Sequence, residues 1–258
     1  IGGEVRRDYG LGVAGAVAAD GEAAGGRVDF LWLGEDLGTQ IAPIISLETF
    51  RKHIRPRYQP FVDLAKQHGA WLMIDDAHGF GVHGVQGCGV VDPARHGCDE
   101  VPVLVGTLGK AFGTAGAFVA GSDSLIETLI QRARHYIYTT AMPSALAVAT
   151  LESLRIARIE EWRRTRLAEH VARFRQGAAQ LGLQLLPSST PIQPLVIGAA
   201  GPTLEIGAAL EARGVLVGVI RAPTVPAGTA RLRITFSALH EAADVDRLLA
   251  ALAEALQA

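Results

Sequence analysis

Three continuous apolar runs in the middle of the chain predict β-strands. They lie at residues 70–74, 103–105 and 117–120, and each is followed directly by aspartate or glycine. Their residues are apolar at successive positions and do not alternate with polar ones. Runs that are apolar on both faces are typical of parallel strands covered by helices. The pattern therefore predicts an α/β fold with a mostly parallel sheet flanked by helices.

Apolar residues at helical spacing predict helices around these strands. Residues 61–68 read as a short helix that ends at Gly69, because glycine often terminates a helix. Ser122 can cap the N-terminus of a helix that runs through residues 125–130. Between residues 167 and 181, apolar side chains recur at i, i+4, i+7, i+11 and i+14, which is one face of a long helix.

The pattern changes after Pro187 to shorter segments. Residues 231–236 alternate between polar and apolar side chains, as a half-buried strand does. A helix near residues 203–213 is closed by Gly214, and a last helix places apolar residues on one face between 245 and 256. We expect this last helix to begin near Ser237 or His240.

These patterns divide the chain into three regions. The first is rich in glycine, with ten glycines in its first 40 residues, and one strand is expected there at residues 28–33. The second region holds the apolar runs, and the third holds the shorter segments. The regions are 1–59, which is unassigned; 60–186, the core of a large domain; and 187–258, a smaller C-terminal α/β domain.

Composition argues against several classes of protein. The formal net charge of −2 over 258 residues gives no electrostatic reason to expect nucleic acid or a membrane surface as a partner. No apolar run approaches the ~20 residues of a membrane span, and residues 1–8 lack the apolar core of a secretory signal. We therefore expect a cytoplasmic protein. Cys88 and Cys98 are the only cysteines, which are too few and too far apart to predict a metal site.

Two residues with reactive side chains follow apolar runs. Asp75 follows the first run directly, with His78 three residues further on, and Lys110 lies just beyond the second run. In open α/β sheets, ligands bind at the carboxyl ends of strands. No charged residue stands between Glu100 and Asp123 except Lys110. We expect this lysine to be shielded from water, which lowers its proton affinity and makes its amine a nucleophile toward carbonyls.

Two ligands could account for these residues. A nucleotide phosphate would suit a glycine-rich loop, but only two residues separate Gly106 from Gly109, and Ala111 stands where magnesium needs Ser or Thr. Pyridoxal 5′-phosphate (PLP) needs a lysine for its Schiff base and a carboxylate for its pyridinium nitrogen. Lys110 and Asp75 supply both groups, so the residues favour PLP without deciding the matter.

Longer segments around these residues carry a family resemblance. Residues 71–82, 106–113 (Gly-Thr-Leu-Gly-Lys-Ala-Phe-Gly) and 132–143 closely resemble the α-oxoamine synthases, which are PLP-dependent enzymes of the aminotransferase-like fold type I. The similarity spans about residues 60–258. The phosphate loop and the stacking histidine that the family carries before this region find no match in residues 1–59.

The resemblance implies a role for each residue near the cofactor. Lys110 would form the Schiff base and later move the Cα proton of the substrate. Asp75 would pair with the pyridinium nitrogen, and His78 would contact the phenolic oxygen of the ring. Thr107 would lie beside the cofactor near its phosphate.

The resemblance also implies a shared active site and a substrate site. Thr139 and Thr140 match residues that reach the phosphate of the neighbouring subunit in a homodimer. The residues alone fit the simple end of a helix equally well. Arg221 matches the residue that holds the carboxylate of the amino acid, and Thr224 and Arg233 match residues near the acyl substrate.

The implied reaction is a decarboxylative condensation of L-alanine with a pimeloyl thioester, carried on coenzyme A or on acyl carrier protein, in biotin biosynthesis. Related activities of the same family are the alternatives: glycine C-acetyltransferase, 5-aminolevulinate synthase and serine palmitoyltransferase. A non-catalytic relative that binds PLP or a partner is the alternative from another class.

Overall fold

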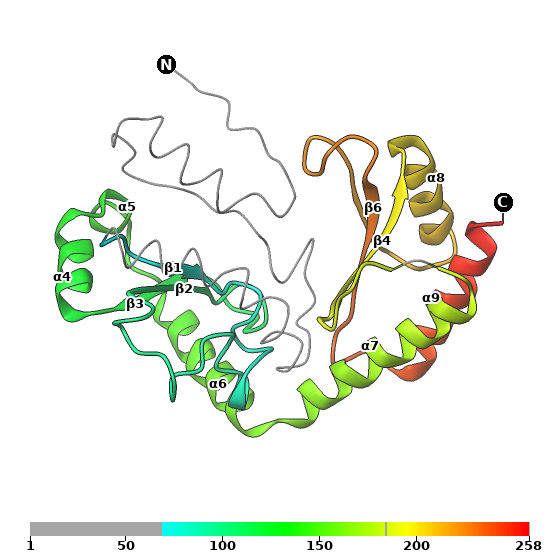
Figure 1. Ribbon diagram of the computed structural model, residues 1–258. Helices are drawn as coiled ribbons and strands as arrows, with labels where there is room; N and C mark the ends of the chain where they lie inside the picture. The colour runs from blue at the N-terminus through cyan, green and yellow to red at the C-terminus, as the bar shows by residue number, and fades with distance from the viewer. Residues whose placement is uncertain (1–68, 184, 258) are drawn as a thin grey trace, which may run out of the picture. The chain divides into compact units, whose positions relative to one another are not determined.

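The computed structural model describes residues 69–183 and 185–257 (Figure 1). The chain divides into two compact units, and every described helix and strand belongs to the unit formed by Asp36–Ser46 and Trp71–Ala258. The helix expected at 61–68 and the strand expected at 28–33 lie outside the described residues. No helix in the described part is long and apolar enough to cross a membrane.

The first sheet contains the three strands predicted from the apolar runs. They are β1 (Met73–Asp75), β2 (Val103–Thr107) and β3 (Ala117–Gly121), in the order β1-β2-β3. Strands β1 and β2 are parallel, as expected. Strand β3 is antiparallel to β2, with Thr107 opposite Ala117, so the expected direction of this strand is wrong. The connection between them is too short for the crossover that parallel neighbours require.

Burial of this sheet is also lower than its apolar runs predict. Most residues of the three strands are half-buried or exposed, and Gly106 is the buried one. The helices that follow are α4 (Asp123–Arg132), α5 (Arg134–Ile137) and α6 (Ser144–Ile159). The predicted cap is confirmed, since the Ser122 side chain accepts a hydrogen bond from the Leu125 backbone N–H.

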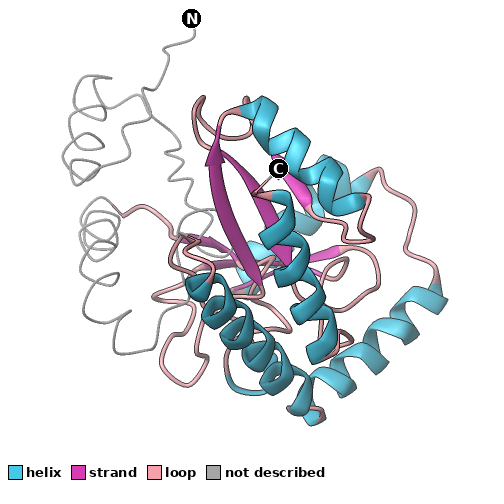
Figure 2. Ribbon diagram, turned by 90° about the vertical axis from the view of Figure 1, so that its right-hand side faces the viewer, coloured by secondary structure: helices cyan, strands magenta, loops and turns pink. Residues whose placement is uncertain are grey.

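The second sheet is wholly antiparallel, with the order β4-β6-β5. Three helices pack on it, and Figures 1 and 2 show them on the same face. The elements of this part are α7 (Trp162–Gln180), β4 (Ile192–Gly198), α8 (Ala200–Glu211), β5 (Gly218–Ile220), β6 (Ala230–Thr235) and α9 (Ala242–Ala255).

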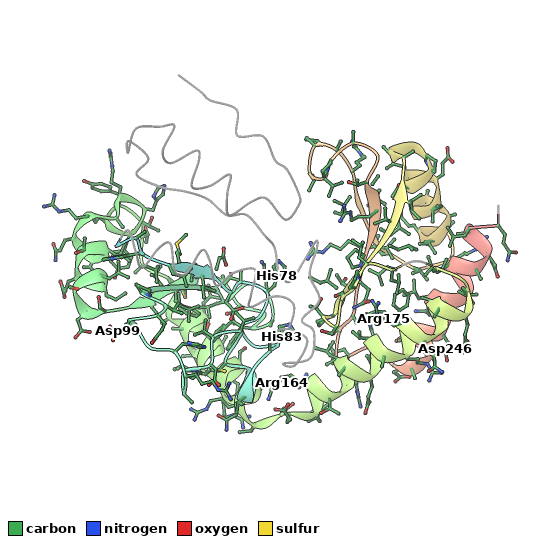
Figure 3. The ribbon with its side chains drawn as sticks, viewed as in Figure 1. His78, His83, Asp99, Arg164, Arg175 and Asp246 are labelled. Atoms are coloured by element: carbon green, nitrogen blue, oxygen red, sulfur yellow. The ribbon has the colours of Figure 1, made fainter. Side chains whose placement is uncertain are left out.

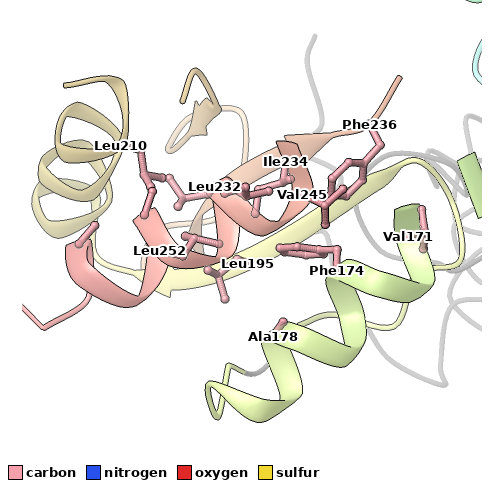
Figure 4. Close-up of a cluster of buried hydrophobic side chains, with 13 residues drawn as sticks. Val171, Phe174, Ala178, Leu195, Leu210, Leu232, Ile234, Phe236, Val245 and Leu252 are labelled. Atoms are coloured by element: carbon pink, nitrogen blue, oxygen red, sulfur yellow. The ribbon is translucent and has the colours of Figure 1, made fainter. Parts of the chain in front are cut away.

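A single hydrophobic core joins this sheet to its helices (Figure 4). Phe174 of α7, Leu210 of α8, Leu232 of β6 and Leu252 of α9 have no exposed surface. The alternation predicted for β6 is confirmed, because Leu232 and Ile234 point into this core.

Helix α7 is part of this core. Val171, Phe174 and Ala178 lie on its buried face, as the spacing predicts, and Phe174 contacts Phe236 with 5.3 Å between ring centroids. Leu181 follows the last turn and is exposed. The division of the chain at residues 186/187 places α7 in the large domain, whereas its buried face packs on β4, β6 and α9.

The last helix begins close to His240, as expected. Helix α9 starts at Ala242, with Glu241 and not Ser237 or His240 as its N-cap. The Asp244 carboxylate accepts a hydrogen bond from the Glu241 backbone N–H at 2.9 Å. An acidic side chain in the first turn satisfies an unpaired N–H and interacts favourably with the helix dipole.

Replacing Leu232 by alanine tests the core around the second sheet. The change leaves a cavity among residues that cannot fully collapse, so we expect the free energy of unfolding to fall by roughly 2–5 kcal/mol. Urea denaturation measures it. The matched control is Leu216→Ala, because Leu216 is 84% exposed; that change should cost less than about 0.5 kcal/mol. Equal losses in both variants would contradict the assignment of this core.

Candidate active site

The site residues near the first sheet lie at one edge of it. Strand β1 ends at Asp75 and β2 ends at Thr107, and Asp75 pairs with Val105 across the parallel ladder. Parallel strands end at the same edge, so Asp75 and Thr107 share the carboxyl edge of the sheet. Lys110 follows three residues after Thr107. The prediction that Asp75 and Lys110 lie at the ends of neighbouring strands is confirmed, because Asp75 is the last residue of β1 and Lys110 follows the end of β2.

The chain turns sharply after Asp75. The Asp75 carboxylate accepts a hydrogen bond from the Ala77 backbone N–H at 3.0 Å. The backbone N–H groups of Gly79 and Phe80 both donate to the Asp76 carbonyl, at 3.1 and 3.0 Å. This turn carries His78, which is half-buried (Figure 3). The Asp75 side chain is exposed, so its carboxylate is accessible to a ligand.

Lys110 lies in the loop of residues 108–116 between the antiparallel strands β2 and β3. The Thr107 hydroxyl donates to the Gly116 carbonyl at 3.2 Å and accepts from the Gly109 N–H at 3.3 Å. The Leu108 N–H also donates to the Gly116 carbonyl at 2.9 Å, which closes the base of the loop. Thr107 therefore shapes the backbone that presents Lys110.

Helix α6 holds this loop from its far side. The Ser153 hydroxyl donates to the Phe112 carbonyl at 2.8 Å, and the Thr150 hydroxyl donates to the Thr114 hydroxyl at 3.0 Å. Since α6 is a regular α-helix of 16 residues, these hydrogen bonds fix the loop to a long helix.

A stack of two phenylalanine rings joins the Asp75 turn to the Lys110 loop. Phe80 lies on Phe112 with 4.7 Å between centroids and 8° between ring planes. Phe118 of β3 meets Phe80 edge-on at 4.9 Å. A Cβ at Gly81 would lie 2.9 Å from the Phe112 ring and 3.0 Å from the Ala111 side chain. Glycine is therefore required where the turn passes the neighbour of Lys110.

The Lys110 side chain is exposed, which corrects the expectation of a shielded lysine. Within residues 69–183 and 185–257 it makes no hydrogen bond or ion pair. The loop extends beyond the edge of the sheet, so the flanking glycines and apolar residues do not cover the amine. This leaves the amine accessible to an incoming carbonyl group.

Asp76 is a buried carboxyl group that the sequence pattern did not single out. It is 5% exposed, and burial raises its pKa from the ordinary value of 3.8 to about 6. Hydrogen bonds from the backbone N–H groups of Val90 and Gly79 oppose this rise, and the charge of Asp75 adds to it. Burial dominates because it disfavours the ionised form. The glycines at 79 and 89 were the available signal, since both make room for this carboxylate.

His83 is a second titratable group with an altered proton affinity. It follows the turn that carries His78 (Figure 3), and burial lowers its pKa from 6.5 to about 4. It is therefore neutral at physiological pH. Among the described residues, no group of three or more His, Cys, Asp or Glu side chains is placed to hold a metal ion.

The predicted phosphate-binding threonines follow helix α5. Both Thr139 and Thr140 are exposed. The Thr139 hydroxyl donates to the His135 carbonyl, so it ends the helix in the way that the sequence alone also allowed.

The predicted substrate residues belong to the second sheet. Arg221 and Thr224 are exposed in the loop between β5 and β6, where the Thr224 N–H donates to the Arg221 carbonyl at 3.0 Å. Arg233 lies on β6, on the opposite face from Leu232. Its Nε atom is buried and has no hydrogen-bond partner in the described part of the chain. A buried N–H donor without a partner is rare and points to a ligand group that would satisfy it.

These features define an α/β protein whose lysine and carboxylate follow the ends of adjacent parallel strands. The chain belongs to the aminotransferase class I and II family, whose model matches residues 55–252. This agrees with the fold type expected from the sequence motifs.

Individual relatives narrow the comparison. The chain is 63% identical over 190 residues to an 8-amino-7-oxononanoate synthase of Stutzerimonas stutzeri, a match that covers 74% of this chain and 48% of the relative. A synthase of the same name from Pseudomonas syringae pv. tomato is 62% identical over 188 residues, or 73% of this chain and 48% of the relative. The chain therefore spans about half the length of the curated relatives it matches.

Solved structures give the same fold. An 8-amino-7-oxononanoate synthase from Francisella tularensis superposes with a TM-score of 0.67 at 29% identity, over 76% of this chain and 58% of that one. A serine palmitoyltransferase from S. paucimobilis with bound PLP and myriocin gives a TM-score of 0.71 at 27% identity, over 78% and 50% of the two chains.

Asp76 makes stability depend on pH in a defined direction. Its folded pKa of about 6 exceeds the ordinary value of 3.8, so the folded state binds its proton more tightly. The stabilisation is complete below 3.8 and is lost as the pH rises through about 6. We compare the free energy of unfolding of the wild-type protein with that of Asp76→Asn. The wild-type value minus the variant value should fall between pH 3.8 and about 6, and it should stay constant at higher pH.

Urea denaturation of both proteins at several pH values measures this difference. His83 has the opposite effect, because its folded pKa is lowered, but it is present in both proteins and cancels. A difference that stays constant with pH would show that folding does not shift the pKa of Asp76, and one that rises with pH would show that folding lowers it.

Proposed function

We propose that this chain is the cofactor-binding and C-terminal part of an enzyme that condenses L-alanine with a pimeloyl thioester to give 8-amino-7-oxononanoate, in biotin biosynthesis. The proposal is carried by one observation: Lys110 and Asp75 follow the ends of adjacent parallel strands in a chain 60–63% identical to synthases of that name. A cytoplasmic location belongs to the same proposal.

The residues at this edge fit PLP. The Lys110 amine is exposed and unpaired among the described residues, and the Asp75 carboxylate is accessible at the same edge of the sheet. When bound, PLP supplies an aldehyde for the lysine amine and a protonated ring that accepts electrons from the substrate carbon. Lys110 would hold the cofactor and, as a neutral amine, take the proton from the Cα atom of alanine.

The neighbouring residues would orient the ring. The Asp75 carboxylate would keep a proton on the ring nitrogen, because an opposite charge at short range favours the protonated form. His78 would donate to or accept from the phenolic oxygen. Thr107 shapes the Lys110 loop and would lie near the phosphate.

The arginines of the second sheet would bind the substrates. Arg221 is exposed without an ion pair among the described residues, and its guanidinium suits a carboxylate such as that of alanine. The buried and unpartnered Nε of Arg233 supports a polar contact with the acyl substrate, with Thr224 nearby in sequence. Coenzyme A and acyl carrier protein are both compatible carriers.

Two further assignments complete the proposal. Thr139 and Thr140 would contact the phosphate bound by a second copy of the chain, in a homodimer with shared active sites. The small C-terminal domain would begin near residue 160, ahead of α7, because that helix packs on β4, β6 and α9.

A serine palmitoyltransferase activity is the second candidate. Solved enzymes of that name superpose with TM-scores of about 0.7, as 0.71 for the one from Sphingomonas wittichii. Their identity of 27–28% is far below the 60–63% shared with the 8-amino-7-oxononanoate synthases, which favours the first candidate.

Replacing Lys110 by alanine tests the cofactor link. The unmodified protein, mixed with PLP and reduced with borohydride, should gain the mass of one reduced cofactor on the peptide that contains Lys110. Lys110→Ala should lose this addition, because no other amine follows the strand end. Peptide mass spectrometry and the visible absorbance of the complex provide the measurement.

Lys66→Ala is the matched control, since Lys52, Lys66 and Lys110 are the only lysines of the chain. The control should keep the addition at Lys110. Cofactor on Lys66 in preference to Lys110 would contradict the proposed site.

Substrate choice is tested with amino acid and thioester pairs. L-Alanine with pimeloyl-CoA should release free thiol and CO2, whereas L-serine with palmitoyl-CoA should release at least about tenfold less, the discrimination that pocket contacts of 1–3 kcal/mol provide. Faster release with serine and palmitoyl-CoA would favour the second candidate.

A further inference from the structure

The buried carboxyl group of Asp76 has contacts that suggest a role toward the active site. Its backbone N–H donates to the Val105 carbonyl at 2.8 Å, which extends the β1–β2 pairing by one residue. Its backbone carbonyl accepts the N–H groups of Gly79 and Phe80, and so closes the turn that carries His78. Asp76 thus joins the strand to the turn through its main chain alone.

The side chain of Asp76 makes a third connection. Its carboxylate accepts a hydrogen bond from the Val90 backbone N–H at 2.9 Å, across 14 residues of sequence. The carboxylate therefore binds the turn of residues 75–80 to the segment of residues 89–90.

Two glycines make the space for this carboxylate. A Cβ at Gly79 would lie 2.0 Å from one carboxylate oxygen, and a Cβ at Gly89 would lie 1.9 Å from the other. Gly89 also has a φ of 98°, which disfavours any residue with a side chain. The backbone is thus closed around the Asp76 carboxylate on both sides.

These contacts constrain the groups that would face the cofactor. Asp75 and His78 flank Asp76 within four residues, and Phe80 of the same turn stacks on Phe112 of the Lys110 loop. If the carboxylate were removed, the turn would keep its backbone bonds but lose its tie to residues 89–90. The direction of the Asp75 carboxylate and the Ala77 N–H that binds it would then be less restricted.

We propose that Asp76 is a positioning residue: its buried carboxylate holds the turn of residues 75–80 so that Asp75 and His78 face the ring of the cofactor bound at Lys110. This inference rests on the proposed function for the identity of the cofactor. It does not require Asp76 to touch the cofactor, since the carboxylate is directed to the Val90 N–H.

The first experiment uses the protein without cofactor. Hydrogen exchange, followed by NMR, reports the N–H groups of Val90 and Ala77. In Asp76→Ala the Val90 N–H should exchange at least about tenfold faster, because it loses its hydrogen bond to the carboxylate. The Ala77 N–H should also exchange faster, because the Asp75 carboxylate that accepts it is less restricted. The N–H of Leu232 in the second sheet should keep its rate, which distinguishes local release from general unfolding.

The second experiment measures PLP binding by absorbance. We expect Asp76→Ala to weaken binding by about tenfold or more and to shift the pH at which the visible band of the complex titrates, because Asp75 no longer holds the ring proton in place. Asp76→Asn keeps one acceptor and should restore part of both properties. A residue that acts only on folding would leave the band and its titration unchanged.

Asp92→Ala is the matched control. The Asp92 carboxylate also accepts a backbone N–H, that of Ala94 at 3.0 Å, but it is exposed and does not contact the turn of residues 75–80. It should leave PLP binding, the band and the exchange of Ala77 unchanged.

The outcomes separate this proposal from the proposed function. If the unmodified protein forms no reducible link to PLP, the proposed function fails, while the exchange of Ala77 still tests the positioning of Asp75. Unchanged exchange of Ala77 in Asp76→Ala, with faster exchange of Val90, would overturn the role of Asp76. If the alanine variant does not fold, Asp76→Leu decides, because leucine also lacks an acceptor for the Val90 N–H. Wild-type exchange at both Ala77 and Val90 in that variant, together with wild-type PLP affinity and band, would overturn the role of Asp76.

Discussion

The stack of Phe80 on Phe112 is the contact on which the candidate site depends. Each ring belongs to a loop that carries reactive groups, Asp75 and His78 in one and Lys110 in the other. Loops at a sheet edge have few backbone bonds to each other, so a large apolar contact is needed to fix their relative position. The parallel pairing of β1 with β2 brings the two loops together, and the rings then hold them at a defined distance.

The charged side chains of the site differ in their exposure to solvent: Asp75 and Lys110 are exposed, and Asp76 is buried. The side chains proposed to meet the cofactor, those of Asp75 and Lys110, are exposed and keep their charges accessible. Asp76 is buried next to Asp75, and its raised pKa reports the cost of an ionised group there. The carboxylate offsets part of this cost by accepting a hydrogen bond from the Val90 backbone N–H.

The second sheet has the more complete hydrophobic core. Helix α7 contributes Phe174 to it, ties to α9 through the Arg173–Asp246 ion pair and reaches β4 through the Arg175–Gln193 hydrogen bond. On the other face of the sheet, β6 carries Arg233 with its unpartnered Nε. A rigid sheet that is packed on one face thus presents an unsatisfied donor on the other, which suits the binding of a polar substrate group.

Local patterns in the sequence determined the presence of β1 and β2, the cap at Ser122, the buried face of α7 and the placement of Asp75 and Lys110 near strand ends. Each depends on residues a few positions apart, which periodicity and capping chemistry report directly. Only the tertiary structure decided the direction of β3, the exposure of Lys110, the burial of Asp76 against Val90 and the sheet on which α7 packs. These depend on contacts between segments far apart in the chain, and apolar runs show that a segment can be buried without showing which segment buries it.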